Sequence, residues 1–269
     1  MKGLKKSILC VLVGALTLGT VGCTSQKKEV SELQGIKNKG VLTIGTSADY
    51  PPYEFHKKIN GKDTIVGFDM MIAEEIAKDL GVKLEIKDMK FDGLLGALKS
   101  KNIDMVIAGM TPTEERKKAV DFSDTYYNGG NVILVKKENL NKYKTIQDLK
   151  DAKIGVQKAS LQEGIVKDVI QATNTKSLSK IADVVLELEN GNVDAVVISK
   201  ETTKGYLKQY QDIDYANVDL GESTAEGSAI AVSKSEDKAL LDEVNKVLTK
   251  LSKEGKIEDF VEKATELAQ

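Results

Sequence analysis

The residue with the most distinctive chemistry in this chain is Arg116, the only arginine among 39 lysine and arginine residues. A guanidinium presents five donors in a rigid plane. It holds a carboxylate through two parallel charge-assisted hydrogen bonds, each contributing about 1.5–3 kcal/mol. Lysine cannot provide this geometry. We therefore expect Arg116 to anchor a carboxylate; the alternative is a surface cation on the lysine-rich helix that it begins with Lys117 and Lys118.

Few other residues have the types and spacing that catalysis needs. His56 is the only histidine, and it stands beside Lys57 and Lys58 in a polar stretch where we expect a solvated side chain. The chain has no G-x-S-x-G nucleophile elbow, no phosphate-binding glycine loop, no dinucleotide-binding glycine fingerprint and no cluster of metal-ligand residues. We therefore expect a binding protein that needs no cofactor and no metal, not an enzyme.

The first 22 residues have the features of a secretory signal peptide. Three lysines precede an apolar stretch over residues 8–18, which is too short to cross a bilayer. Residues 20–23 (TVGC) resemble a lipobox, in which Cys23 is acylated and becomes the first mature residue, although leucine is usual in place of Thr20. We expect a lipid anchor on the extracytoplasmic face of the cell membrane, at the cell surface or in the periplasm. The alternative is cleavage near Gly22 and release of the protein.

Removal of this signal changes what the mature chain contains. The loss of three lysines moves the formal net charge from −2 to about −5, which suggests no nucleic-acid partner. Cys10 is lost as well, so Cys23 is the only thiol and a monomer, the state we expect, forms no disulfide. Residues 24–36 are polar and lysine-rich, and we expect a flexible tether over residues 23–37. The remaining length of about 230 residues fits two lobes of roughly 110 residues each.

The first half of the folded part reads as alternating strands and helices. Residues 41–45 form a β-branched run, and the pair Asn60-Gly61 is typical of a tight hairpin. Apolar residues at helical spacing follow Asp69 and stop at Gly81, and Thr113 with the acidic pair after it fits the start of a later helix. The other expected elements are strands at 82–86 and 104–108 and a short helix at 94–98. This order predicts a parallel sheet.

The pattern then restarts and predicts a second α/β lobe. Strands are expected at 131–135, 153–156 and 194–198, and helices at 161–172 and 178–188. An apolar stretch at 228–232 is followed by two amphipathic helices at 238–251 and 256–267. In open parallel sheets, ligands bind beyond the carboxyl ends of the strands. We expect loops at four such ends, from both lobes, to face one cleft: residues 46–50, 108–111, 157–161 and 199–202.

Several motifs resemble, in order and spacing, the polar amino-acid binding proteins of ATP-driven importers, the extracellular solute-binding proteins of family 3. They extend over nearly the whole mature chain: residues 46–55 (TSADYPPYEF), 66–69 (VGFD), 91–95 (FDGLL), 107–116 and 120–123 (VDFS).

The resemblance implies an α/β fold of two lobes, like the type II periplasmic binding proteins. Each lobe is then a sheet flanked by helices, and two hinge crossings, near residues 127–130 and 225–227, join them. Closure about such hinges traps a ligand. The expected boundaries are residues 38–128 plus 226–269 for the first lobe and 129–225 for the second.

The resemblance also assigns roles in the first lobe. Arg116 matches the arginine that binds the α-carboxylate of the ligand, and Thr111 offers a hydroxyl to that carboxylate or to the amine. Ala108 and Gly109 match positions where small side chains leave backbone groups free to bond.

Other matched positions surround the rest of the ligand. Tyr50 and Phe91 match the aromatic and apolar faces that sandwich the ligand side chain. Ser160 and Leu161, in the second lobe, match a hydroxyl and a backbone N–H that complete the carboxylate site near a helix N-terminus.

Two departures from the family pattern concern the charge of the ligand. Many members have an aspartate for the ligand ammonium where this chain has Ser199, with Glu201 two residues later, so the partner of the amine is unassigned. Asp194 is expected to orient a strand end. Ser47 stands where binders of lysine, arginine or glutamine carry an aspartate that reads the side chain. Asp49 is expected to be a surface carboxylate; the alternative is that it replaces this aspartate. The sequence therefore does not support specificity for a cationic side chain.

Taken together, these features predict a lipoprotein that captures a polar L-amino acid by lobe closure and delivers it to a membrane permease driven by an ATPase. The expected ligand-binding set includes Ser47 and Ser199 with the residues named above. Two alternatives remain open: a lyase like the cyclohexadienyl dehydratases, which share the fold, and a sensor-type binding protein. A lyase needs a carboxylate in the pocket that acts as acid or base, and the sequence indicates none.

Overall fold

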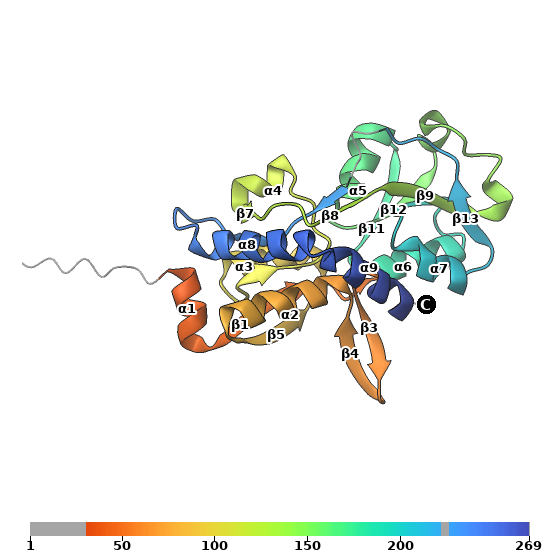
Figure 1. Cartoon of the computed structure of the whole chain (residues 1–269). Helices are drawn as coiled ribbons and strands as arrows, with labels where there is room; N and C mark the ends of the chain where they lie inside the picture. Colours follow the sequence, from red (N-terminus) through yellow and green to blue (C-terminus); the bar gives the residue numbers. More distant parts are fainter. Residues whose placement is uncertain (1–30, 222–225, 269) are drawn as a thin grey trace, which may run out of the picture. The chain divides into compact units, whose positions relative to one another are not determined.

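The computed structural model describes residues 31–221 and 226–268, which belong to one compact unit, Ser31–Gln269. Two five-stranded sheets organise this unit, and helices flank each of them (Figure 1). The predicted two-lobe α/β fold is therefore confirmed, and we call the first sheet with its helices lobe 1 and the second sheet with its helices lobe 2. In the part of the chain described, every helix is too short or too polar to cross a bilayer.

Lobe 1 is built on a mixed sheet in the order β5-β1-β6-β15-β7. Strand β1 pairs in parallel with β5 and β6, while β15 runs antiparallel to β6 and β7. The predicted parallel pairing is confirmed for β5, β1 and β6, and the sheet as a whole is mixed because a late segment of the chain returns to it in the opposite direction. The strands are β1 (Val41–Thr46), β5 (Lys83–Asp88), β6 (Met105–Val106), β7 (Val120–Phe122) and β15 (Ala231–Ser233).

Six helices accompany this sheet, and a hairpin extends from it (Figure 1). Its turn is Asn60-Gly61, as predicted: Ile59 pairs with Lys62, and both turn residues have positive φ, 51° and 79°. The helices are α1 (Glu32–Lys39), α2 (Phe68–Leu80), α3 (Leu94–Lys99), α4 (Glu114–Ala119), α8 (Ala239–Lys253) and α9 (Lys256–Leu267); the hairpin sheet comprises β2 (Asp49–Tyr50), β3 (Glu54–Ile59) and β4 (Lys62–Val66), and a 3₁₀ turn spans Phe91–Gly93.

Lobe 2 repeats the arrangement with the strand order β11-β10-β12-β9-β13. Strand β10 pairs in parallel with β11 and β12, and β9 runs antiparallel to β12 and β13. The strands are β9 (Asn131–Lys136), β10 (Lys153–Gln157), β11 (Asn174–Leu178), β12 (Ala195–Ser199) and β13 (Ile213–Ala216). The helices are α5 (Leu161–Gly164), continued by a π-helix at Ile165–Ile170, α6 (Ile181–Glu189) and α7 (Thr203–Gln209), with 3₁₀ turns at Lys137–Asn139 and Ile146–Leu149.

One aspartate in each lobe holds together the starts of two parallel strands. In lobe 1 the carboxylate of Asp104 accepts the N–H of Thr43 at 2.7 Å, and its own N–H donates to the Thr43 oxygen. In lobe 2 Asp194 makes the same pair of bonds with Lys153, at 2.8 and 2.7 Å. Asp194 therefore orients a strand, at its beginning, and Asp104 has the same structural role in lobe 1.

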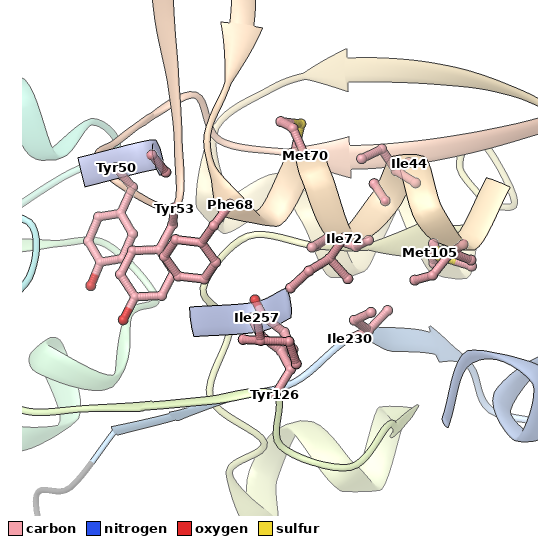
Figure 2. Close-up of a cluster of buried hydrophobic side chains, with 14 of the residues drawn as sticks. Ile44, Tyr50, Tyr53, Phe68, Met70, Ile72, Met105, Tyr126, Ile230 and Ile257 are labelled. Carbon is pink, nitrogen blue, oxygen red and sulfur yellow. The ribbon is translucent and has the colours of Figure 1, made fainter. Parts of the chain in front are cut away.

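Aromatic rings fill the core of lobe 1 beside the hairpin (Figure 2). The ring of Tyr53 lies 4.5 Å from that of Phe68 and 5.0 Å from that of Tyr50. Gly67 permits this packing: its φ is 137°, and a Cβ there would lie 1.9 Å from the main-chain oxygen of Tyr53. The same buried cluster continues into lobe 2 through residues such as Ile181, so the two lobes share apolar contacts.

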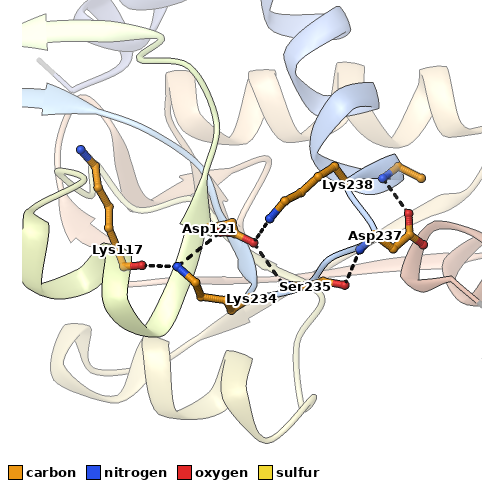
Figure 3. Close-up of polar contacts among 7 residues, drawn as sticks. Lys117, Asp121, Lys234, Ser235, Asp237 and Lys238 are labelled. Atoms are coloured by element: carbon orange, nitrogen blue, oxygen red, sulfur yellow. Dashed lines mark hydrogen bonds and ion pairs between the residues drawn. The ribbon is translucent and has the colours of Figure 1, made fainter.

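Two short strands cross between the lobes and pair with each other. They are β8 (Tyr127–Gly129) and β14 (Glu226–Ser228), which run antiparallel. Beyond the second crossing, Asp121 on β7 fixes the returning chain (Figure 3). Its carboxylate accepts the N–H of Ser235 at 3.1 Å and pairs with Lys238 at 2.6 Å and Lys234 at 3.7 Å. The lobe boundaries given in the sequence analysis stay a prediction.

Two sequence expectations need correction, and one lies outside the described residues. Residues 32–37, expected in a flexible tether, belong to helix α1, where Ser31 caps the first turn and Ile36 is buried. The helix expected at 178–188 begins only at Ile181, because residues up to Leu178 form the edge strand β11. The signal peptide, Cys23 and the rest of the tether up to residue 30 are outside the part that the structure describes.

Candidate functional site

A small pocket, called the cavity below, lies where strand ends of the two lobes meet. Nine of the ten residues predicted to bind a ligand line it: Ser47, Tyr50, Phe91, Ala108, Gly109, Thr111, Arg116, Ser160 and Leu161. Three further residues line it that were outside the predicted ligand-binding set: Glu54, Gln162 and Gln157, which lies in the loop at 157–161 expected to face the cleft.

The topology explains why residues so distant in sequence line one cavity. Ser47 follows β1, Ala108 and Gly109 follow β6, and Ser160 comes shortly after β10. Each therefore lies just beyond the carboxyl end of a strand that takes part in parallel pairing, where open α/β sheets place their ligands. The rule used on the sequence selected three of the four loops correctly.

Arg116 is positioned by helix α4, whose first turn Thr113 caps as predicted. One guanidinium nitrogen donates to the main-chain oxygen of Thr111 at 2.6 Å, and the other donates to that of Ala159 in lobe 2 at 2.8 Å. The guanidinium also lies 5.4 Å from the centre of the Phe91 ring, in a cation–π contact. The fork is thus aimed at the cavity by contacts from both lobes.

Gly109 connects the cavity wall to a buried carboxylate. Its φ is +53° and a Cβ would lie 3.0 Å from the Tyr50 ring, so a side chain there is unfavourable. Its N–H donates to Asp69 at 2.8 Å, and the Tyr126 hydroxyl donates to the same carboxylate at 2.9 Å. Burial nevertheless raises the pKa of Asp69 to about 6, while these two donors act against the rise.

Glu54 is the feature of this site that the sequence analysis missed. Its side chain is fully buried, and neither carboxyl oxygen has a hydrogen-bond partner among the described residues. Burial raises its pKa well above the usual value, and the negative charge of Asp69 adds to this rise. A buried acid without a partner is costly unless something else in the cavity satisfies it.

The lobe 2 wall consists mainly of hydroxyl and amide groups. Ser160 caps α5: its hydroxyl donates to the oxygen of Gln157 at 2.7 Å and accepts the N–H of Glu163 at 3.2 Å. The amide of Gln162 donates to Asn131 on β9 at 2.7 Å. These bonds fix a polar wall with no charged group opposite Glu54 and Arg116.

Three other residues weighed in the sequence do not line the cavity. Ser199 is fully buried at the end of β12, and its hydroxyl donates to Glu201 at 2.9 Å; its place in the binding set stays a prediction. Asp49 is partly buried between the lobes and is not a solvated surface carboxylate. His56 is 44% exposed, as expected for a solvated residue, and lies 3.0 Å from Asp63.

Residues 31–221 and 226–268 contain no group of three or more histidine, cysteine, aspartate or glutamate side chains placed to hold a metal ion. The cavity is instead a mixed site, with aromatic faces, one guanidinium and one unpartnered acid. Such an arrangement suits a small molecule that carries both a negative and a positive group.

Comparison with known proteins agrees with this geometry. Residues 42–266 match the family described as bacterial extracellular solute-binding proteins, family 3. The chain is 36% identical to the arginine-binding extracellular protein ArtP of Bacillus subtilis over 97% of its own length and 98% of that protein. It is 32% identical to a probable histidine-binding protein of Campylobacter jejuni, with the same coverage of both chains.

A solved structure gives the same result in three dimensions. It is an amino acid ABC transporter substrate-binding protein, AbpA of Streptococcus pneumoniae, bound to L-arginine. The two structures superpose with a TM-score of 0.83 at 36% sequence identity, covering 87% of this chain and 98% of that one. The proteins named here are binding proteins of amino acids, not enzymes.

Proposed function

Because this chain belongs to the bacterial extracellular solute-binding proteins of family 3, we propose that it captures a polar L-amino acid by closure of its lobes and delivers it to an ATP-driven import permease. The observation that carries the proposal is the presence of a guanidinium and a buried carboxyl group in one cavity. Arg116 presents a guanidinium, and Glu54 presents a carboxyl group with no partner among the described residues. An amino acid with a second positive group matches both.

We further propose that the ligand is cationic, with arginine the first candidate. The α-carboxylate binds Arg116, the ligand side chain lies between Tyr50 and Phe91, and its cationic end reaches Glu54. The sequence did not support such specificity because it contained no acid at Ser47, and Glu54 supplies one from the adjacent strand β3. Arginine-binding relatives favour the same ligand. Another relative is named as a probable histidine-binding protein, so histidine is a second candidate ligand to be tested.

The cellular context belongs to the same proposal. Cleavage before Cys23 and its acylation tether the protein at the extracytoplasmic face of the membrane, where a monomer meets the permease and its ATPase. Labelling the intact protein with a fatty-acid probe tests the anchor: wild type becomes labelled, and the Cys23→Ser variant does not.

A panel of ligands tests the binding function. Protein lacking residues 1–23, which keeps the compact unit Ser31–Gln269, is screened by thermal shift against the twenty amino acids, ornithine, citrulline and cystine, and hits are titrated by calorimetry. We expect stoichiometric binding with arginine ahead of its neutral analogue citrulline. Equal affinity for the two ligands contradicts the assignment of Glu54, and no binding of any amino acid contradicts the function itself.

Glu54 also justifies testing the lyase alternative, because it is a raised-pKa carboxyl group in the cavity, the feature that such catalysis requires. Prephenate and arogenate are incubated with the same protein and their loss is followed by absorbance. Turnover that Glu54→Gln abolishes, without stabilisation by any amino acid, favours the enzyme over the binding protein.

A further inference from the structure

Asp49 makes a contact between the lobes that lies outside the cavity. It belongs to β2 in lobe 1, and its carboxylate accepts the N–H of Ile181, the first residue of α6 in lobe 2, at 2.7 Å. The Tyr206 hydroxyl, also from lobe 2, donates to the main-chain oxygen of Asp49 at 3.3 Å. Ser47, which lines the cavity, donates to the same carboxylate at 3.1 Å. Asp49 thus connects a cavity residue to the opposite lobe.

Helix α6 lacks a cap from its own lobe. The residue at its N-cap position is Lys180, which has extended backbone (φ −115°, ψ 133°) but makes no side-chain capping bond. Ile181 is buried, with 2% of its surface exposed. The first N–H groups of a helix have no partner within the helix, and leaving one buried without an acceptor is unfavourable. The acceptor here comes from another sheet, more than 130 residues earlier in the chain.

We propose that Asp49 is a cap supplied across the cleft, which completes α6 only when the lobes close and thereby sets ligand affinity without touching the ligand. This inference rests on the lobe closure proposed above. With the cleft open, water solvates the first N–H groups of α6. With the cleft closed, water leaves and the Asp49 carboxylate takes its place. Closure is favourable only if that replacement occurs.

The contact depends on an acceptor oxygen more than on a negative charge. Burial raises the pKa of Asp49, and this effect is larger than the opposing effects of the Ile181 amide, the Ser47 hydroxyl and the Lys180 ammonium. The free energy that the carboxylate loses on desolvation in the closed cleft is therefore larger than the favourable free energy of its electrostatic contacts there. Asparagine retains an oxygen of similar position, so Asp49→Asn keeps most of the function that Asp49→Ala loses.

Calorimetry on the soluble protein lacking residues 1–23 measures the effect with L-arginine, or with the tightest amino acid of the panel. We expect Asp49→Ala to weaken binding about fivefold or more, which corresponds to the loss of an N-cap acceptor, and Asp49→Asn to weaken it less. Lys180→Ser places a capping hydroxyl in α6's own lobe; combined with Asp49→Ala it restores affinity. The control is Asp148→Ala, which removes a cap contained within lobe 2 and leaves affinity unchanged.

Hydrogen exchange separates closure from simple stability. In wild type, peptides that contain the Ile181 amide become protected when ligand is added, and in Asp49→Ala this added protection is lost. An unchanged dissociation constant in Asp49→Ala overturns the inference while the binding function stands. If no amino acid binds wild type, the proposed function fails, and the inference that rests on it fails as well.

Discussion

The guanidinium of Arg116 donates to the main-chain oxygen of Ala159 at 2.8 Å, so the one arginine of the chain bonds directly to the opposite lobe. This bond places the group that we propose as the carboxylate anchor between the two lobes. The same side chain can therefore contact a bound ligand and a main-chain group of lobe 2 at once, which couples ligand binding to the contact between the lobes. Lysine, with a single ammonium, cannot satisfy both directions with planar geometry.

Arg116→Lys, which keeps the charge, is expected to weaken amino-acid binding about 10- to 100-fold. The reason is the loss of one or two charge-assisted hydrogen bonds, each worth about 1.5–3 kcal/mol. Arg116→Gln should be at least as impaired. Calorimetry measures both, and Lys118→Gln, an exposed change on the same helix, serves as the control. An unchanged dissociation constant for Arg116→Gln contradicts the proposed carboxylate site.

Glu54→Gln is expected to change stability and affinity in opposite directions. The ligand-free protein gains stability, because a buried acid without a partner is replaced by a neutral amide. Arginine binding weakens by about 2 kcal/mol or more, roughly 30-fold, since truncating one side of a buried charge pair leaves the other charge unpaired.

Citrulline separates charge from shape in this test, because it matches arginine in size and is neutral. Its affinity should change little in Glu54→Gln. Asp63→Asn, on the exposed hairpin, is the matched control and should alter neither measurement. If Glu54→Gln weakens the binding of arginine and citrulline equally, Glu54 only lines the cavity and does not discriminate a charged ligand from a neutral one.

Stability of the ligand-free protein should fall as pH rises from about 4 to above 6. Asp69 has its pKa raised from 3.8 to about 6, and the pKa of Glu54 is raised well above 4.5. The folded protein therefore binds more protons than the unfolded chain in this window, so their contribution is present below it and lost as pH rises through it. For Asp69 alone the loss is about 3 kcal/mol.

Urea unfolding between pH 5 and pH 8 measures this dependence. Asp121 and Asp148 have lowered pKa values and stay ionised over that range, so they add no slope. Glu54→Gln should flatten the curve partly, and an identical pH dependence in wild type and Glu54→Gln would show that the acid is not titrating. Bound arginine should also flatten it, because the cation replaces the proton at Glu54.

Asp121→Ala is expected to destabilise the fold by about 1 kcal/mol and to leave ligand affinity unchanged. It removes the bonds to Ser235 and Lys238 that attach the returning chain to β7 (Figure 3). The lysine partners are partly exposed, so the ion pairs contribute little and the backbone bond contributes most. Chemical unfolding checks the size, and Asp124→Asn, beside it in sequence and exposed, is the comparison.

Local signals in the sequence predicted most elements of the fold. Helix α2 ends at Gly81 in a left-handed conformation, and Asn60-Gly61 forms the expected turn. Helix α1 was missed because Ile36 is its only buried residue, too few for a periodic pattern to be visible. Its capping residues could be recognised in the sequence, since Ser31 directly precedes Glu32 and Gly40 follows the last helical residue.

The site was predictable where a motif or a strand end marked it, and not where tertiary packing created it. Glu54 stands inside the resembling segment, but the alternation of β3 does not reveal that its acid faces a cavity and not solvent. The signal available was an acid directly following Tyr53 in an aromatic stretch. Ser199 shows the converse: its position was selected from the family pattern, and only the structure shows that its hydroxyl donates to Glu201.

The pairing of β8 with β14 has a mechanical consequence. Residues Tyr127 and Ser228 face each other in register, as do Gly129 and Glu226. Two separate linkers would let the lobes slide or twist independently, whereas a hydrogen-bonded ribbon bends as one piece. The lobes should therefore rotate about a single hinge axis, and each closure should bring the same residues of the two lobes into contact.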